Sequence, residues 1–369
     1  MCERGVSLLP VGGERKRIDR AILAAISDFD LDLSGIRVLT EAASGPFAVT
    51  AMAALMARAQ KVIAVTRDSP YGQADEIANA MFEWAKTLEL DERLTIQVGR
   101  PEIPNGSVDL VTNLGFVRPI DRCLLSQLSS DAVVALMWEP WEARSDDVDF
   151  GAARELAIPI VGTNENHGRV RTFEFLGIVA AKLLLERRFA ILGSNIAIVA
   201  SDPFGGPIAK TLSDLGASVH RYEPAARKLQ ISEWYDSLRR RPDAIVLAEH
   251  RSRDLLIGRS AIPPHRLAED SAAIIHICGA LDLVEIERCG VEIYPPQPAT
   301  AGRMTVTTGF VAASPVINLH VAGLRVGEIT IRARRRGASP EMAVAAAVES
   351  GLAIAMPDAM AIDRGSSVS

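Results

Sequence analysis

Apolar runs of strand length alternate with amphipathic helical stretches along most of this 369-residue chain. This alternation predicts parallel strands with helices on both faces of the sheet, that is, a doubly wound α/β architecture. Helices such as 48–59 and 74–88 separate the strands of the first half. Those strands are expected at 36–40, 62–66, 94–98, 108–112, 132–137 and 158–162.

The same pattern restarts after a long helical stretch at about 167–189. The strands of this second part are expected at 196–199, 219–222, 244–248, 272–277 and 291–294. We therefore predict two doubly wound parallel-sheet domains joined by a linking helix. The predicted boundaries are 1–168 for the first domain, 169–190 for the helix and 191–312 for the second domain.

The last residues, 313–369, contain a long segment at 316–334 and a second helix. In that helix Ser339 is expected as the N-cap and Pro340 as the first residue. A finished sheet is not easily extended, so we expect these residues to form helices that return to the first domain.

Composition describes an ordinary globular protein, with 48% hydrophobic and 23% charged residues and a formal net charge of -6. The negative charge argues against a nucleic-acid partner. A signal-peptide pattern is missing, and the most apolar helical segment carries Glu174 and Lys182, so neither secretion nor a membrane partner is expected. The four cysteines show no CxxC spacing, which excludes an evident zinc site and favours the reducing cytoplasm. We predict no metal.

Residues 196–224 have the length and order of a strand, turn, helix and second strand that bind a dinucleotide. The second strand ends at Glu223, where an acid would bind a ribose hydroxyl. Two of the three glycines of the phosphate turn are replaced, by Ala200 and Asp202, and Asp202 would repel a phosphate. NAD(P) binding is therefore possible but expected to be weak. The candidate cofactor-binding residues are Ser201, Phe204, Gly205, Gly206 and Glu223.

With this turn and the segment 243–282, the second half resembles the cofactor domain of the D-isomer-specific 2-hydroxyacid dehydrogenases. The resemblance covers about 195–311 and implies a Rossmann-like, NAD(P)-binding fold and an oxidoreductase-like enzyme. It also implies a homodimer built on the cofactor domain. In the first half only the architecture matches.

Compared with that family, this chain lacks the catalytic residues. Cys278 stands where the family has its carboxylate-binding Arg, Gln297 where it has a Glu, and Thr308 or Gly309 near the place of its His. Hydride transfer to a ketone needs a proton donor and a cation for the carboxylate. His320 is a substitute for the missing base or, as lone histidines more often are, a structural residue.

The first half also resembles, more faintly, the core of the class I S-adenosylmethionine methyltransferases. A strand, the turn EAASG, a helix and a strand followed by Asp68 carry this resemblance, together with a strand near Asp109. That family has a glycine-rich turn, whereas only Gly45 is present here. S-adenosylmethionine is therefore a less favoured cofactor than NAD(P).

Polar and aromatic residues follow the strands of the first half as compact strings: DSPYG, NLGFVRPID, MWEPWEAR and GTNENH. Ligands of open α/β sheets bind beyond the carboxyl ends of the strands. The candidate substrate-binding residues are Glu41, Asp68, Tyr71, Asn113, Arg118, Trp141, Arg144 and Asn164. Structural roles are the alternative: Asp68 as a cap of the following turn, and Asn164 as a helix N-cap.

Arg118 and Arg144 can each bind a carboxylate or phosphate through two hydrogen bonds, and a tryptophan can stack on a flat group. Glu139, Glu165 and His167 are the candidate catalytic residues for acid–base chemistry, with Glu142 beside them. Glu139 on a solvated loop is the alternative interpretation.

Three functions stay open at this point. The first is a diverged relative of the dehydrogenases that acts on a small anionic substrate in a cleft between the domains. The second is an enzyme of different chemistry, including a methyltransferase-like one. The third is a catalytically silent protein of a biosynthetic pathway that binds a small molecule or a peptide.

Overall fold

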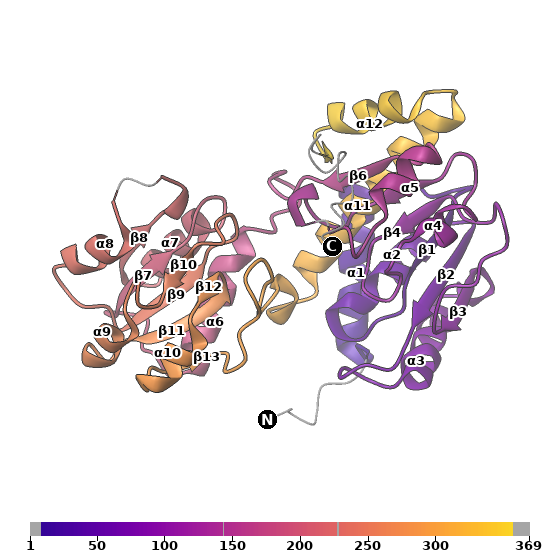
Figure 1. The fold of residues 1–369 in the computed structure, drawn as a ribbon. Helices are drawn as coiled ribbons and strands as arrows, with labels where there is room; N and C mark the ends of the chain where they lie inside the picture. The colour runs from indigo at the N-terminus through magenta and orange to yellow at the C-terminus, as the bar shows by residue number, and fades with distance from the viewer. Residues whose placement is uncertain (1–8, 143, 227–228, 357–369) are drawn as a thin grey trace. The chain divides into compact units, whose positions relative to one another are not determined.

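The computed structural model describes residues 9–142, 144–226 and 229–356, and the side chain of Trp141 lies outside this described part. The chain divides into two compact units (Figure 1). Unit 1 comprises residues 1–171 and 312–369, and unit 2 comprises residues 172–311. Each unit is built on a mainly parallel sheet covered by helices, which confirms the predicted α/β fold class.

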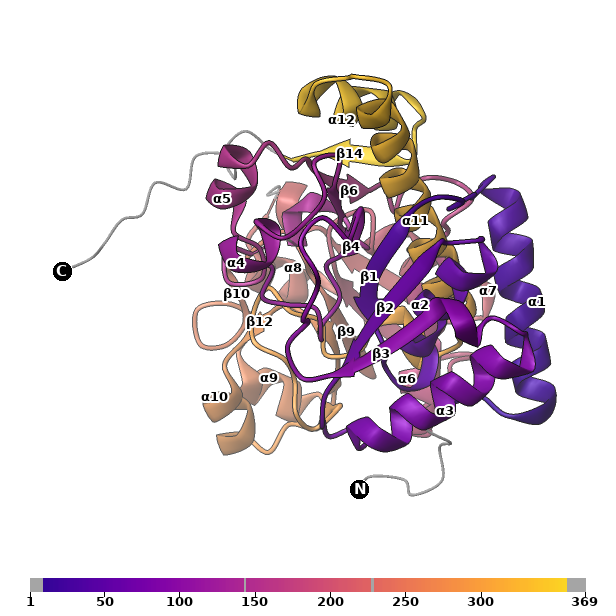
Figure 2. The same ribbon diagram turned by 90° about the vertical axis from the view of Figure 1, so that its right-hand side faces the viewer.

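Unit 1 is built on a seven-stranded sheet in the order β14-β6-β5-β4-β1-β2-β3 (Figure 2). All neighbours pair in parallel except β14, which is antiparallel to β6. The strand order reverses between β1 and β4. The strands are β1 Arg37–Glu41, β2 Lys61–Thr66, β3 Leu94–Val98, β4 Leu110–Thr112, β5 Val133–Ala135, β6 Ile160–Thr163 and β14 Ala353–Ala355.

The two faces of this sheet bury alternate residues of each strand, because side chains in a strand point to opposite sides. Val38 and Val62 join a core with α1, α2, α3 and α11, whereas Leu39 and Ile63 join a core with α4 and α5. The unit 1 helices are α1 Gly12–Asp28, α2 Val49–Met56, α3 Ala74–Thr87, α4 Arg122–Leu125, α5 Phe150–Glu155, α11 Ser314–Arg335 and α12 Pro340–Glu349.

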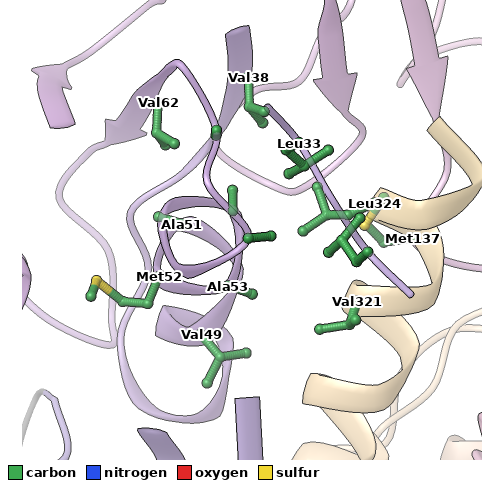
Figure 3. Packing of buried hydrophobic residues seen from close by; sticks show 14 of the residues in the cluster. Leu33, Val38, Val49, Ala51, Met52, Ala53, Val62, Met137, Val321 and Leu324 are labelled. Carbon is green, nitrogen blue, oxygen red and sulfur yellow. The ribbon is translucent and has the colours of Figure 1, made fainter. Parts of the chain in front are cut away.

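Helix α11 crosses the middle of the sheet, where Val321 and Leu324 pack near α2 and Val38 (Figure 3). Gly323 permits this close approach, because a Cβ there would lie 2.6 Å from Cε of Met137. The C-terminal part of the chain thus completes the core of unit 1.

The C-terminal residues differ from expectation in one element. Helix α12 begins as predicted, with Ser339 as N-cap and its Oγ accepting a hydrogen bond from the Met342 N–H at 3.2 Å. The expectation that these residues would not extend the sheet was wrong, because β14 adds an antiparallel edge strand to β6. Three residues are too few for a periodic strand pattern, so only pairing with β6 defines this strand.

Unit 2 contains a five-stranded parallel sheet in the order β13-β11-β9-β7-β8, and the order reverses between β7 and β9. These strands are β7 Asn195–Val199, β8 Ser218–Tyr222, β9 Ala244–Ala248, β11 Ala273–Cys278 and β13 Ile293–Tyr294. A small second sheet pairs β10 Leu255–Ile257 with β12 Ala280–Leu281.

Helices cover both faces of the unit 2 sheet. Ile196 and Ile198 of β7 face α6 and α7, and Ala197 and Val199 face α8, α9 and α10. The helices are α6 Glu174–Glu186, α7 Gly205–Asp214, α8 Ile231–Ser237, α9 Pro264–Glu269 and α10 Leu283–Arg288. Helix α6, which the sequence suggested as a link, belongs to unit 2 and packs closely on α7, where Gly177 meets Thr211.

Short 3-10 turns complete the two units: η1 Gly45–Ala48, η2 Asp91–Arg93, η3 Pro140–Glu142, η4 Pro224–Ala226 and η5 Thr308–Phe310. Within the described residues no helix is long and apolar enough to cross a membrane.

Candidate functional site

The carboxyl ends of the parallel strands in unit 1 meet at one edge of the sheet, and the strand order reverses there between β1 and β4. Ligands of doubly wound folds bind outside such a reversal point. The candidate substrate-binding and catalytic residues of the sequence follow β1, β2, β4, β5 and β6. These residues therefore belong to the carboxyl edge of the unit 1 sheet, and the candidate cofactor-binding residues belong to the corresponding edge of unit 2.

Four of the unit 1 candidates serve the fold or face solvent. The buried Asn113 side chain accepts a hydrogen bond from the Met137 N–H at 2.8 Å, and Asp68 accepts one from the Ala74 N–H at the start of α3 at 2.9 Å. Asn164 Nδ2 donates to the Gly351 carbonyl at 2.9 Å, and Tyr71 is 78% exposed. Asp68 thus has the capping role that was the alternative interpretation.

Glu41 is buried at the end of β1. Its Oε2 accepts a hydrogen bond from the Phe116 N–H at 3.1 Å. Burial raises the pKa of Glu41 to about 7, although the Phe116 N–H and the nearby charge of Arg118 act against the rise. Arg67 stabilises the same loop, because its Nη2 lies 3.0–3.1 Å from the carbonyl oxygens of Gly115, Phe116 and Arg118.

The two candidate arginines converge on Asp147. Nη1 of Arg118 lies 2.7 Å from Oδ2 of Asp147, and Nη1 of Arg144 lies 3.9 Å from the same oxygen. The Arg118 guanidinium also stands 5.4 Å from the ring centre of Trp138. In the described part of the chain, Arg118 Nε and Trp138 Nε1 are buried donors without a hydrogen-bond acceptor. Trp141 is a candidate whose side chain lies outside the described structure.

Glu139, Glu142 and Glu165 form a cluster beside these arginines. Oε1 of Glu165 accepts a hydrogen bond from the Glu139 N–H at 3.3 Å, and Asn166 Nδ2 donates to Glu139 at 3.2 Å. Burial, followed by the charges of Glu142 and Glu139, raises the pKa of Glu165 well above its ordinary value. Burial also raises the pKa of Glu142 to about 7, and a hydrogen bond joins its carboxyl to that of Glu165. At neutral pH Glu142 and Glu165 therefore share a proton.

His167 stands apart from this cluster. Its Nδ1 accepts a hydrogen bond from the Arg169 N–H at 3.3 Å. Burial and then the charge of Arg169 lower the pKa of His167, whereas a neighbouring carboxylate would raise it. Sequence analysis therefore identified two members of the glutamate cluster, Glu139 and Glu165. Only the short distance along the sequence suggested His167.

At the corresponding edge of unit 2, Glu249 binds the backbone of two loops. It is 2% exposed and follows β9, beside the reversal point of the sheet. Its carboxylate accepts hydrogen bonds from the N–H groups of Ser201 at 2.7 Å, Arg251 at 2.7 Å and Ser252 at 2.9 Å. Glu249 is not among the residues expected from the sequence, because a single acid after a strand has no distinguishing pattern.

Asp202 lies just before the N-terminus of α7. In a dinucleotide-binding fold this is the place that holds a phosphate of the ligand. Its Oδ1 accepts a hydrogen bond from the Gly206 N–H at 2.9 Å and lies 2.8 Å from Nη2 of Arg221. Arg221 also approaches Glu223, with 3.6 Å between Nη2 and Oε2. A Cβ at Gly205 would overlap the Arg221 side chain and lie 2.6 Å from the Ala200 carbonyl oxygen, so Arg221 covers the turn.

Phe204 is also engaged within unit 2. Its ring stacks on His250 with 4.0 Å between ring centres, and burial lowers the pKa of His250 to about 4. The candidates Ser201, Phe204, Gly205, Gly206 and Glu223 thus do come together at one turn. The turn's charged and polar groups bind other protein groups, so these residues do not fit a dinucleotide held through its phosphates.

At the positions of the family's catalytic Arg, Glu and His, the described structure has no residue with the same chemistry. Cys278 is buried, Gln297 is exposed, and Thr308 is buried in η5. His320 is structural: it is buried in α11 with its Nδ1 2.6 Å from the Thr50 hydroxyl, and burial lowers its pKa to about 3. Among the described residues no group of three or more His, Cys, Asp or Glu side chains could hold a metal ion.

Comparison with known proteins shows a likeness of fold. No family model matches the chain, and no curated protein matches its sequence. A dipicolinate synthase chain from Bacillus subtilis matches with a TM-score of 0.51 and 15% identity, over 83% of this chain and 99% of that chain. The dipicolinate synthase chain from Bacillus halodurans matches with a TM-score of 0.51 and 14% identity, over 79% of this chain and 96% of that chain.

Solved dehydrogenase structures match less closely. The NAD-dependent formate dehydrogenase of Staphylococcus aureus, in complex with NAD, has a TM-score of 0.40 and 13% identity, over 72% of this chain and 92% of that chain. The chain thus has a Rossmann-like fold similar to those of the dipicolinate synthase chains. The resemblance inferred from the sequence is confirmed at the level of the fold.

Proposed function

We propose that this protein is an enzyme, diverged from Rossmann-like dehydrogenases, that binds a small anionic molecule at the carboxyl edge of the unit 1 sheet and exchanges a proton with it. The observation that carries the proposal is the pair of hydrogen-bonded carboxyl groups of Glu142 and Glu165, both with raised pKa values, near Arg118 and Arg144. Strongly shifted pKa values with an identifiable charge partner mark functional sites.

The arginines supply the anion recognition. Both guanidinium groups converge on the carboxylate of Asp147, at 2.7 Å from Arg118 and 3.9 Å from Arg144. Arg118 Nε and Trp138 Nε1 are donors that the described protein groups leave without an acceptor. Buried donors are normally satisfied, and a carboxylate oxygen of the ligand satisfies them through charge-assisted hydrogen bonds.

The glutamates supply the proton transfer. A carboxyl group with a pKa near 7 has comparable protonated and ionised fractions at neutral pH, so it acts as a general acid or a general base. Glu142 has such a pKa, and its hydrogen bond to Glu165 lets the proton move between the two carboxyl groups. Arg144 stabilises the ionised form of Glu142.

The proposal uses no nicotinamide at the phosphate turn of unit 2, because Asp202, Arg221 and Glu249 occupy the donors and the space of that turn. Dipicolinate is the first ligand to test, since both structures with a TM-score of 0.51 are dipicolinate synthase chains and dipicolinate is a planar dicarboxylate.

The proposal is tested with a thermal-shift and calorimetry panel of dipicolinate, acyclic dicarboxylates, NAD, NADP, S-adenosylmethionine and adenosine. We expect a dicarboxylate to raise Tm and NAD to leave it unchanged. Calorimetry in buffers of different ionisation enthalpy should show proton uptake or release on binding that Glu165→Gln removes. A Glu269→Gln variant, at an exposed position of α9, is the control. The proposal fails if no dicarboxylate binds or if Glu165→Gln leaves the proton exchange unchanged.

A further inference from the structure

An apolar groove lies in unit 1, away from the candidate site. It has a volume of about 700 Å³ and is lined by residues of α5, of α12 and of the β14–β6 end of the sheet. Figure 2 shows where these helices and strands lie in unit 1. Its lining is mostly apolar and includes Ile158, Pro159, Ile160, Val344, Val348 and Met356. Exposed apolar surfaces of this kind are typical of interaction sites.

The groove adjoins an open sheet edge. In the described structure β14 has a single strand neighbour, β6, so its other side carries backbone groups that no strand pairs. The three residues of β14 are Ala353, Ile354 and Ala355, without the charge or proline that commonly protects an edge. Such an edge favours pairing with another strand.

Charges at the groove indicate which partner fits it. Arg154 of α5 and Glu341 of α12 both line the groove. Arg154 has no ion pair within the described residues, and the Glu341 carboxylate accepts a hydrogen bond from the Ser339 hydroxyl. A two-fold axis brings each surface against an identical one, and a groove with one charge of each sign can then pair Arg154 of one copy with Glu341 of the other. The charges of the groove are therefore compatible with a second copy of this chain.

We propose that the groove between α5 and α12, together with β14, is the interface with a second copy of this chain. The β14 strands of the two copies pair antiparallel across the two-fold axis, and α12 contributes Val344 and Val348 to the shared apolar contact. This location differs from the dimer on the cofactor domain that the sequence resemblance implied. It does not depend on the proposed function.

The test is the molar mass in solution, measured by light scattering and sedimentation across a concentration series of the full chain. The wild-type protein should be a dimer. Ala355→Arg and Val348→Glu should each weaken dimerisation at least tenfold, because each buries a charge in an apolar contact. Arg20→Glu on α1 and Glu83→Arg on α3 are matched controls at exposed positions and should leave the mass unchanged. Circular dichroism verifies that every variant is folded.

A charge exchange identifies the pairing itself. Arg154→Glu or Glu341→Arg alone should weaken the dimer, because two like charges then meet across the axis, and the double variant should restore the affinity to within about threefold of wild type. A monomeric wild-type protein, or a dimer that neither Ala355→Arg nor Val348→Glu weakens, would overturn the proposal. Failure of the double variant to restore binding would overturn the Arg154–Glu341 pairing.

Discussion

The carboxyl edges of the two parallel sheets look alike in sequence but differ in how their polar groups are satisfied. In unit 2, Glu249 and Asp202 accept hydrogen bonds from backbone N–H groups of the turn, and Arg221 forms an ion pair with Asp202. In unit 1, Arg118 and Trp138 keep buried donors that described protein groups do not satisfy, and Glu142 and Glu165 have raised pKa values. Unit 2 therefore keeps the spacing of a dinucleotide-binding motif, but internal hydrogen bonds and an ion pair take the place of the contacts to a ligand.

This difference has a physical reason. A helix N-terminus attracts any negative charge, and the carboxylate of Asp202, attached to the turn itself, competes with every phosphate in solution at a very high effective concentration. In the described structure, Asp147 pairs with Nη1 of Arg118, whereas Nε of Arg118 has no acceptor. Unit 2 thus uses this edge for internal hydrogen bonds, whereas unit 1 has buried donors there that no described group satisfies.

The largest expected effect is on the stability of unit 2. Glu249→Ala should lower the free energy of unfolding by roughly 3 kcal/mol, because three backbone N–H groups lose a charged acceptor and at least one stays buried without a partner. Urea denaturation measures the change. Glu269→Ala, at an exposed position of α9, is the matched control and should change stability by less than about 0.5 kcal/mol. An equal loss in both variants would contradict the structural role of Glu249.

The second effect is a pH dependence in unit 1. The pKa of Glu41 is about 7 in the folded protein, against an ordinary value of 4.5, so the folded state binds more protons between these pH values. Stability from this group is therefore lost as pH rises from about 4.5 to 7, and the loss is complete above that window. Glu41→Gln keeps an acceptor for the Phe116 N–H and removes the titration.

Wild type and Glu41→Gln should accordingly be equally stable near pH 4.5, and the variant should be more stable by about 3 kcal/mol near pH 8. Denaturant titrations at a series of pH values measure this difference, with Glu83→Gln on α3 as an exposed control. A difference that does not change with pH would show that Glu41 does not titrate in this window.

The third effect tests the comparison by changing the phosphate turn of unit 2 toward the glycine-rich form that binds a dinucleotide. Ala200→Gly with Asp202→Gly removes the internal carboxylate and releases Arg221 for a phosphate, so NAD should bind at least tenfold more tightly than to wild type. Calorimetry measures both affinities. Tight NAD binding by the unmodified protein would refute the view that Asp202 blocks the turn.

The smallest expected effect is a change of ligand affinity in unit 1. Arg118→Lys keeps the charge but loses Nε and the planar fork, so dicarboxylate binding should weaken about tenfold while Tm changes little. Arg144→Lys should act in the same direction. Arg122→Lys, whose exposed side chain pairs with Glu155, is the control. Intact binding in both Arg118→Lys and Arg144→Lys would reject the anion site.

Much of the fold could be predicted from the chain, because long parallel strands need nearly continuous apolar runs. The expected strand 62–66 is β2 Lys61–Thr66, and the expected strand 244–248 is β9 Ala244–Ala248. Less could be predicted where packing defines the element. The β14 pairing and the placement of α6 in unit 2 depend on contacts between residues far apart in the chain.

The sequence by itself determined the two parallel sheets, the cap of α12 and the weakened phosphate turn, since each follows from local periodicity, a local hydrogen bond or the size of a few neighbouring residues. Only the tertiary structure decided which polar groups meet. The contacts of Asp147 with Arg118, of Glu142 with Glu165 and of Glu249 with Ser201 each join two different loops. Folding buries these groups together, and burial also raises the pKa values of Glu142 and Glu165.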